Sequence, residues 1–473
     1  MNIIFLISVI LKGIGALLEI GLQILITKGI GVSGYGNYTT WINAADLIFW
    51  LFFSGLIKCN TFYLSGNTTS IRSFRKNYYK KYVIPILGIV MIAPIIYTRN
   101  PMTGIVALIT GLELLVLDNS STLIVQGNMV MSLTGEYIIG RLFMVLSVLL
   151  MNTKQLLDLN LLLILYVFQY VLVFCILYLK KSKKKDYTDV SKDVSLKKWG
   201  SYQKADLMHS MIEQLPVVLQ YFFAGAFEAG VVSIVLLVKK LINFISGPTA
   251  KIFLPEFSRL YKENKKKEIR SYYSSIMRIQ MLAVGPLAIV LLGYPKVVLN
   301  ILAEELTGYS GLFMICSVIF LLTATLGPCG GILQMTGNEK MDNRCREMAL
   351  IFMIVIMVLT CKNSYFILYG LCGQVGIEAI AKYCYVCKWM EKSPIDLKTY
   401  LKWWSLPVIL IVITYCFKLQ SSFLWMFIMA AATFGVLLIQ ELKNKETNLF
   451  EKILGKKEGG KSKIKNNMQK GED

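Results

Sequence analysis

Long apolar stretches separated by short polar segments recur along the whole chain. Fourteen such stretches begin near residues 3, 38, 81, 102, 134, 159, 205, 229, 271, 309, 346, 365, 399 and 422. An α-helix needs roughly 20 predominantly apolar residues to cross the hydrocarbon core of a bilayer. The pattern therefore predicts an all-α polytopic membrane protein with about 14 transmembrane helices.

Composition supports this class and excludes others. The 473 residues are 55% hydrophobic, with a mean hydropathy of +0.57. The net charge of +21 resides in short loops and a tail, which is typical of cytoplasmic loops rather than of a nucleic-acid-binding surface. Most of the ten cysteines stand in apolar segments, and Cys384 and Cys387 have no second pair at zinc spacing. With a single histidine, we expect no metal site and no cofactor.

Lysine and arginine are distributed unevenly between the two sides of the predicted membrane. Most of them lie in segments 59–80, 180–204, 251–270, 332–344, 388–398 and 441–473, which alternate with short segments poor in basic residues. Basic loops stay in the cytoplasm. The sequence therefore predicts a multi-pass protein of the cell membrane with both termini cytoplasmic.

The chain also repeats itself. Ser54-Gly55 and Ser246-Gly247 each end a span and precede a basic loop, and Gly127-Asn128 is echoed by Gly337-Asn338. We expect the span that begins near residue 229 to end at Gly247 and Pro248. These echoes predict two six-helix bundles in parallel repeat with two appended helices, a transporter architecture. The predicted parts are an N-terminal bundle at 1–180, a basic linker at 181–204, a C-terminal bundle at 205–390, two further helices at 391–440 and a basic tail at 441–473.

Charged side chains stand inside several spans. A charge at the bilayer midplane costs roughly 2.5–3.5 kcal/mol on insertion scales, so it must face protein or water. In the first span, Lys12 and Glu19 lie on the same helical face as Gln23. Lys239 and Lys240 stand side by side in the middle of the eighth span. These positions predict a polar cavity between the helices.

Two sets of residues are candidates for that cavity. Predicted contacts to a transported substrate are Lys239, Lys240, Lys12, Arg141, Asn243 and Arg278. Predicted sites for a coupling ion are Glu213, Glu19, Asp46 and His209. Adjacent helical residues point about 100° apart, so one lysine of the eighth span faces the cavity centre. Lys239 is preferred over Lys240 because it shares a helical face with Asn243.

Pairing between the charged residues is the alternative interpretation. A buried charge is equally satisfied by an opposite charge on the same or a neighbouring helix. Both lysines of the eighth span would then be held by acids such as Glu19 or Glu213, and Arg278 would extend to the nearby cytoplasmic interface. Glu136 and Arg141 could form a structural pair with another helix, and Lys12 with Glu19 could lock two helices together in the same way. Glu378 and Lys382 are a candidate pair at i,i+4 spacing.

Four motifs resemble one family. They are GVSGYGNY at 31–38, LPEFSRL at 254–260, GPCGGILQMTGNEK at 327–340 and YGLCG at 369–373. With the number and length of the spans, they resemble Wzx-type polysaccharide flippases of the multidrug/oligosaccharidyl-lipid/polysaccharide exporter superfamily. The resemblance implies a MATE-like fold with two bundles around a cavity that opens to one side at a time.

The resemblance also implies a cargo and partners. The cargo would be an undecaprenyl-pyrophosphate-linked oligosaccharide repeat unit for capsule, O-antigen or exopolysaccharide synthesis, moved from the inner to the outer leaflet by alternating access with ion coupling. A fixed cation in the cavity would compensate the pyrophosphate charge. The implied partners are membrane lipids, with a polysaccharide polymerase and chain-length proteins as further candidates.

Other functions stay open on the same residues. A flippase for the peptidoglycan-precursor lipid and a cation-coupled multidrug exporter would share this broad fold. A polysaccharide polymerase is a weaker alternative, because it would need a large outer loop with catalytic residues and the predicted outer loops are short. The chain has no G-x-x-x-x-G-K-[ST] motif for nucleotide binding. We therefore expect a transporter rather than an enzyme.

Overall fold

The computed structural model describes residues 3–55, 57, 79–86, 88–89, 101–126, 128–180, 203, 207, 210–394 and 397–443. Within these ranges, all regular structure is helical. Helices lie at every predicted span, although the third is described only in part, around η1 (Tyr79–Val83). The expected fold class, an all-α polytopic membrane protein with a MATE-like arrangement, is confirmed.

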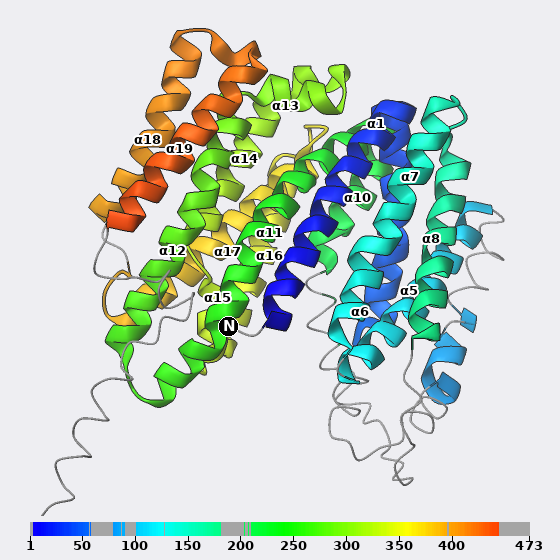
Figure 1. Ribbon diagram of the computed structural model, residues 1–473, viewed down its shortest axis with the longest axis horizontal. Coiled ribbons are helices and arrows are strands. Elements are labelled where there is room, and N and C mark those ends of the chain that lie inside the picture. The colour runs from blue at the N-terminus through cyan, green and yellow to red at the C-terminus, as the bar shows by residue number, and fades with distance from the viewer. Residues whose placement is uncertain are drawn as a thin grey trace, which may run out of the picture.

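The first bundle is built from the N-terminal part of the chain. After α1 (Ile3–Phe52) and η1, its described elements are α5 (Pro101–Val125), α6 (Met129–Thr134), η2 (Gly135–Ile139), α7 (Gly140–Thr153) and α8 (Leu159–Leu179). The elements α6, η2 and α7 form one span. These helices group on one side of the molecule, in blue to cyan (Figure 1).

The second bundle follows in green to yellow on the other side (Figure 1). Its main elements are α10 (Leu215–Ala224), α11 (Ala226–Lys262), α12 (Lys266–Ala288), η3 (Ile289–Gly293), α14 (Ser310–Thr325), α16 (Glu339–Leu359) and α17 (Phe366–Met390). The short elements between its spans are α13 (Pro295–Leu302), η4 (Glu304–Tyr309) and α15 (Cys329–Met335). The helices α18 (Leu397–Cys416) and α19 (Phe423–Lys443), with η5 (Leu419–Ser421) between them, pack outside it against α12 and η3.

Two glycines break the helices at equivalent places. Gly31 has φ +73° and ψ 173°, so α1 is two helices joined at that residue. Gly225 has φ +109° and separates α10 from α11 in the same way. Residues with a Cβ rarely adopt a positive φ of this kind, which explains why glycine stands at both positions. Each bundle thus begins with a pair of helices that turns at a glycine.

The bundles meet where the second half of α1 packs against α11. A Cβ on Gly36 would lie 1.8 Å from the carbonyl oxygen of Ala226, and one on Gly230 would lie 2.4 Å from that of Val32. No side chain fits at either position. The two glycines therefore let the helix backbones approach closely, as small residues do between membrane helices.

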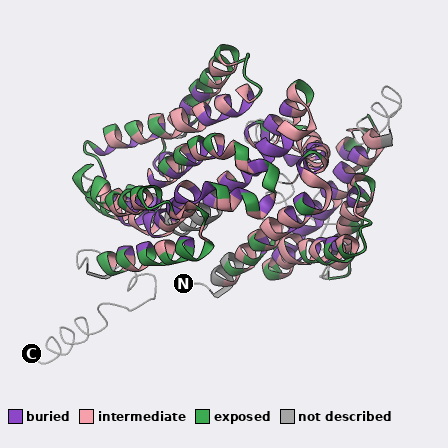
Figure 2. Cartoon of the chain, turned by 90° about the horizontal axis from the view of Figure 1, so that it is seen from above, coloured by how far each residue is buried: buried purple, intermediate pink, exposed green. Residues whose placement is uncertain are grey.

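The outer helical faces expose large apolar side chains. Examples are Leu150 on α7, Phe168 on α8, Ile354 on α16 and Phe427 on α19. Figure 2 shows exposed residues along the outer helices, while buried residues lie where helices pack together. Among the described helices, eight spans are long and apolar enough to cross a membrane. An apolar surface of this extent suits contact with lipid.

One helix end differs from the sequence prediction. The helix α11 does not end at Gly247 and Pro248 but continues to Lys262. A proline inside a helix removes one backbone hydrogen bond, which membrane helices tolerate when the neighbouring structure compensates for it. The first half of the basic segment 251–270 is therefore a continuation of α11 rather than a loop.

The predicted repeat has structural counterparts. Asn128 donates its backbone N–H to the carbonyl of Leu123 over 2.8 Å, and Asn338 donates to Leu333 over the same distance. Asn128 and Asn338, the equivalent residues of the second echo, thus make the same hydrogen bond after a helix. The predicted linker 181–204 and tail 441–473 lie almost entirely outside the described residues, so the domain boundaries stay a prediction.

Candidate functional site

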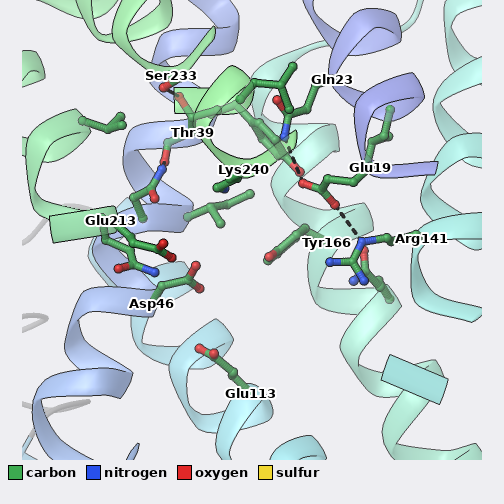
Figure 3. A pocket seen from close by; sticks show the side chains of 18 of the residues that line it. Glu19, Gln23, Thr39, Asp46, Glu113, Arg141, Tyr166, Glu213, Ser233 and Lys240 are labelled. Carbon is green, nitrogen blue, oxygen red and sulfur yellow. Dashed lines mark hydrogen bonds and ion pairs between the residues drawn. The ribbon is translucent and has the colours of Figure 1, made fainter. Parts of the chain in front are cut away.

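A polar cavity of about 470 Å³ lies between the first bundle and the helices α10 and α11 (Figure 3). Residues of α1, α5, η2, α7 and α8 line it from the first bundle, and Ser233 and Lys240 line it from α11. The break at Gly31 allows both halves of α1 to contribute, with Glu19 before it and Asp46 after it.

Acidic groups outnumber basic groups in the lining. Among the described residues, five carboxylates line the cavity, namely Glu19, Asp46, Glu113, Glu136 and Glu213. Two cations, Arg141 and Lys240, stand against them. If all were ionised, the lining would carry an excess of negative charge.

A chain of polar contacts crosses the cavity wall from α1 to α7. The Tyr35 hydroxyl donates to Gln23 over 2.7 Å, and the Gln23 amide donates to Glu19 over 3.0 Å. The Arg141 guanidinium completes the chain with a 2.8 Å hydrogen bond to the other carboxylate oxygen of Glu19. Glu19 is thus satisfied by protein groups, and it fixes α1 to α7 through an ion pair (Figure 3).

Lys12 and Arg141 both contact Tyr137 on η2. The Lys12 ammonium lies 5.4 Å from the centre of the Tyr137 ring, and the Arg141 guanidinium carbon lies 5.3 Å from it. These are cation–π distances. Arg141 also donates to the backbone carbonyl of Glu136. Arg141 thus pairs with a carboxylate of another helix, Glu19 on α1, and the Glu136 carboxylate accepts a hydrogen bond from Ser120 over 3.2 Å.

Aromatic side chains form another part of the wall. Tyr166 and Tyr170 contact each other edge to face with ring centres 5.3 Å apart, and Tyr38 contacts Tyr166 at 6.2 Å. Trp50 also lines the cavity. Aromatic faces combined with amide and hydroxyl groups can contact both the apolar and the hydroxyl faces of a sugar ring.

The two adjacent lysines of α11 differ from the expected arrangement. Lys240 is exposed and lines the cavity, whereas Lys239 is half-buried and is not among the residues that line it. The acidic groups whose charges act on the Lys239 ammonium are instead Glu213 and Glu378. The helical pattern alone does not contain the rotation of α11 within the bundle. Of the two lysines, Lys240 is thus the one that lines this cavity, and the assignment of either lysine to a substrate stays a prediction.

Arg278 lies at a different place from the one predicted. Its guanidinium pairs with Glu441 over 3.3 Å and lines a small space between α12, α18 and α19. Because Glu441 is on the last helix, the pair joins the appended helices to the second bundle. The side chains of Asn243 and His209 lie outside the described residues.

A second group of charges lies between α16 and α17. Lys382 contacts Asp342 at 2.6 Å and Glu378 at 2.7 Å, and Arg346 contacts the same two carboxylates at 3.5 and 3.6 Å. The expected pairing of Glu378 with Lys382 is confirmed. The charges of two cations and two carboxylates compensate one another here, so this group of ion pairs holds α16 and α17 together.

Glu113 is a cavity residue that the sequence analysis missed. It stands alone between apolar residues of α5, without the stripe of polar neighbours that identified the other candidates. A single charge inside an apolar span is itself a functional signal in a membrane protein. The charge of Glu113 inside an apolar span was the only feature of the sequence that could have identified it as a candidate.

Metal binding has no structural support in the described part of the chain. No group of three or more His, Cys, Asp or Glu side chains there is arranged to hold a metal ion. The described cysteines are free thiols, including Cys384 and Cys387.

Comparison with known proteins identifies the fold. No family model matches the chain, and no curated sequence matches it. A structure of the lipid II flippase MurJ in an inward closed conformation has a TM-score of 0.67 at 13% identity, covering 96% of this chain and 100% of its own. An inward-facing multidrug resistance MATE family transporter of the MOP superfamily gives 0.57 at 12% identity, covering 82% and 98%. An outward-facing MATE structure gives 0.51 at 13% identity, covering 81% and 95%.

Proposed function

We propose that the protein is a flippase that moves a lipid-linked oligosaccharide from the inner to the outer leaflet of the cell membrane by alternating access. The observation that carries this proposal is the extent of the structural likeness. The MurJ structure matches 96% of the chain, whereas the inward-facing MATE structure matches 82%. A full-length match favours a lipid-linked cargo over the drug cargo of an exporter.

The cavity chemistry supports a sugar as the part of the cargo that enters it. Tyr166, Gln169 and Asn43 offer hydroxyl and amide groups to the same space, and Trp50 offers an aromatic face. Carboxylates such as Asp46 accept hydrogen bonds from sugar hydroxyls. A purely hydrophobic drug would leave these polar groups unsatisfied, at a cost of about 1–3 kcal/mol each.

The pyrophosphate of such a cargo would need a cation. Lys240 is the lining cation on α11, and Arg141 is already held by Glu19. We assign the pyrophosphate contact to Lys240, since this residue is exposed and lines the cavity, and it forms no short ion pair like that of Arg141 with the residues that the structure describes. A charge-assisted contact of this kind would replace part of the hydration that the pyrophosphate loses.

A flippase for the peptidoglycan-precursor lipid is the second candidate, and the MurJ likeness is the observation that favours it. Both cargoes consist of a polyprenyl chain, a pyrophosphate and a sugar, and they differ in the sugar part. At 13% identity the likeness carries the fold and not the sugar.

The proposal places the protein in the cell membrane with both termini in the cytoplasm. The basic segments 180–204, 251–270 and 441–473 would then face anionic headgroups of the inner leaflet. A polysaccharide polymerase and chain-length proteins are the partners we would expect at the outer face.

Complementation in three bacterial strains tests the function. One strain lacks its repeat-unit flippase, one is depleted of its lipid II flippase, and one lacks its main drug exporters. We expect restored surface polysaccharide in the first strain and no rescue in the other two. Rescue of growth in the second strain would assign the peptidoglycan precursor, and drug resistance in the third alone would overturn the flippase assignment.

A further inference from the structure

One carboxylate oxygen of Glu113 has no hydrogen-bond partner in the part of the chain that the structure describes, although the residue lies within a candidate membrane span. Its side chain lines the cavity from α5 and is only 7% exposed. The unpartnered oxygen is Oε2. An ionised carboxylate buried without a partner costs several kcal/mol, so a group from outside the chain must satisfy it.

The groups that face Glu113 make its negative charge less favourable still. Asp46 on α1 and Glu136 on η2 are the charged residues of the described chain that act on it, and both are acidic. Tyr170 on α8 is a further titratable neighbour. The positive charge of the cavity lysine, Lys240, acts on Asp46, whereas Lys240 is not among the groups whose charges act on Glu113. Figure 3 shows Glu113 well separated from the Glu19–Arg141 ion pair.

The geometry points to a proton as the occupant. Glu113 lines a cavity that is large enough for water, so a proton can reach its unpartnered carboxylate oxygen. A proton needs a single oxygen. We infer that Glu113 is the proton-binding carboxylate of the transport cycle.

The proton transfer is simple to balance. A water molecule or hydronium in the cavity donates a proton, an O–H bond forms at a carboxylate oxygen of Glu113, and the carboxylate charge is neutralised. When the cavity opens to the other side, the proton returns to water there and the carboxylate is ionised again. No other bond is made or broken.

Protonation of Glu113 would reduce the acidic excess in the cavity when a pyrophosphate enters. This coupling role rests on the proposed flippase function, whereas proton binding by Glu113 does not. Proton binding can therefore be measured without any cargo.

The test uses the purified full chain in detergent micelles and follows its melting temperature from acidic to alkaline pH. We expect the wild-type Tm to fall by about 2–4 °C when Glu113 ionises, since a buried charge destabilises the folded state. Glu113→Gln has nearly the shape of the protonated acid and should remove this fall. Glu305→Gln, at an exposed carboxylate of η4, is the matched control and should keep the wild-type profile.

Two further variants guard against a folding defect. Asp46→Asn should move the fall in Tm to lower pH, because Glu113 then ionises beside one negative charge fewer. Glu113→Asp keeps a titratable carboxyl group and should retain a pH-dependent Tm.

The inference is overturned if Glu113→Gln keeps the wild-type pH profile. It is also overturned if sodium chloride, but not choline chloride at equal concentration, stabilises the wild type and not Glu113→Gln, because the occupant would then be a sodium ion. Neither result depends on the complementation strains, so failure of the proposed function and failure of this inference are distinguishable.

Discussion

The hydroxyl groups of Thr39 on α1 and Ser233 on α11 lie 2.9 Å apart and share a hydrogen bond, although 194 residues separate them. The same separation relates Gly31 to Gly225, the two residues at which the helix pairs break. Thr39 and Ser233 are thus equivalent positions of the two bundles in direct contact. An equal offset along the chain is what two repeated bundles would give.

A disulfide at this contact should lock the proposed flippase in one state. In alternating access, the bundles must separate at one end of the cavity to open it. Thr39→Cys combined with Ser233→Cys places two sulfur atoms where oxygens now lie 2.9 Å apart, close enough to form a bond of about 2.05 Å. We expect oxidation to abolish export of lipid-linked oligosaccharide and a reductant to restore it.

The single-cysteine variants are the controls for this experiment. Each keeps the native cysteines and should be insensitive to oxidant, since it lacks the second sulfur. Full export by the oxidised double variant, with the cross-link demonstrated, would mean that α1 and α11 stay together throughout the cycle.

The close approach at Gly36 predicts a strong effect of one methyl group. Gly36→Ala would put a Cβ 1.8 Å from the Ala226 carbonyl oxygen, and backbone atoms cannot move aside as a flexible side chain can. We expect a loss of at least about 1–3 kcal/mol in the free energy of unfolding, measured by denaturant titration in micelles, with a matching loss of export.

Gly21→Ala on the same helix is the matched control. No atom lies within 4 Å of a Cβ at Gly21, so this change should be neutral or stabilise the helix by roughly 0.5–1 kcal/mol. Equal behaviour of the two variants would show that α1 and α11 do not need their close contact.

Several features of this molecule follow from sequence and others do not. The spans are predictable because burial of about 20 apolar residues in lipid is a local property of the sequence. The ion pair of Arg141 with Glu19 is not, because its partners are 122 residues apart and the helical face does not specify which neighbour a charge meets. Likewise, Arg278 is joined to Glu441 on the last helix, which no spacing rule links to the second bundle.

The sequence also does not specify which of the two lysines of α11 faces the cavity. Helical periodicity gives the angle between Lys239 and Lys240 but not the rotation of the helix in the bundle. That rotation depends on contacts with other helices, such as that of Gly230 with Val32. Glu113 was missed for a different reason, since no other charged residue lies on its helical face and Asp46, which lines the same cavity, comes from α1.

The charge group between α16 and α17 should behave as a structural element. Lys382→Met removes the cation from Asp342, which is 1% exposed, and would leave that carboxylate without its closest cation. We expect a loss of about 3–5 kcal/mol in the free energy of unfolding. Lys388→Met, at an exposed position of the same helix, should cost at most about 1 kcal/mol.

A double variant separates charge from packing in this group. Asp342→Asn added to Lys382→Met removes the uncompensated charge and should recover part of the lost stability. No recovery would indicate that packing of the lysine chain, rather than its charge, holds the two helices together.

Substitutions of Lys240 and Lys239 test most directly where the structure differs from the sequence prediction. Lys240 lines the cavity, and its positive charge acts on the carboxylates of both Asp46 and Glu19. It is therefore the cation that a pyrophosphate would meet. Lys239 is instead influenced by Glu213 and Glu378. We therefore expect Lys240→Ala to reduce export at least about tenfold, which corresponds to 1.4 kcal/mol of lost interaction.

The paired measurement is Lys239→Ala, compared at equal protein levels in the membrane. Its loss of export should be smaller, and Lys240→Arg should keep part of the activity because it keeps the charge while changing its shape. The opposite order, with Lys239→Ala inactive and Lys240→Ala normal, would mean that α11 turns during the cycle and presents its other lysine to the cargo. The contact between Gly230 and Val32 would then have to break in that step, which the Thr39–Ser233 disulfide would block.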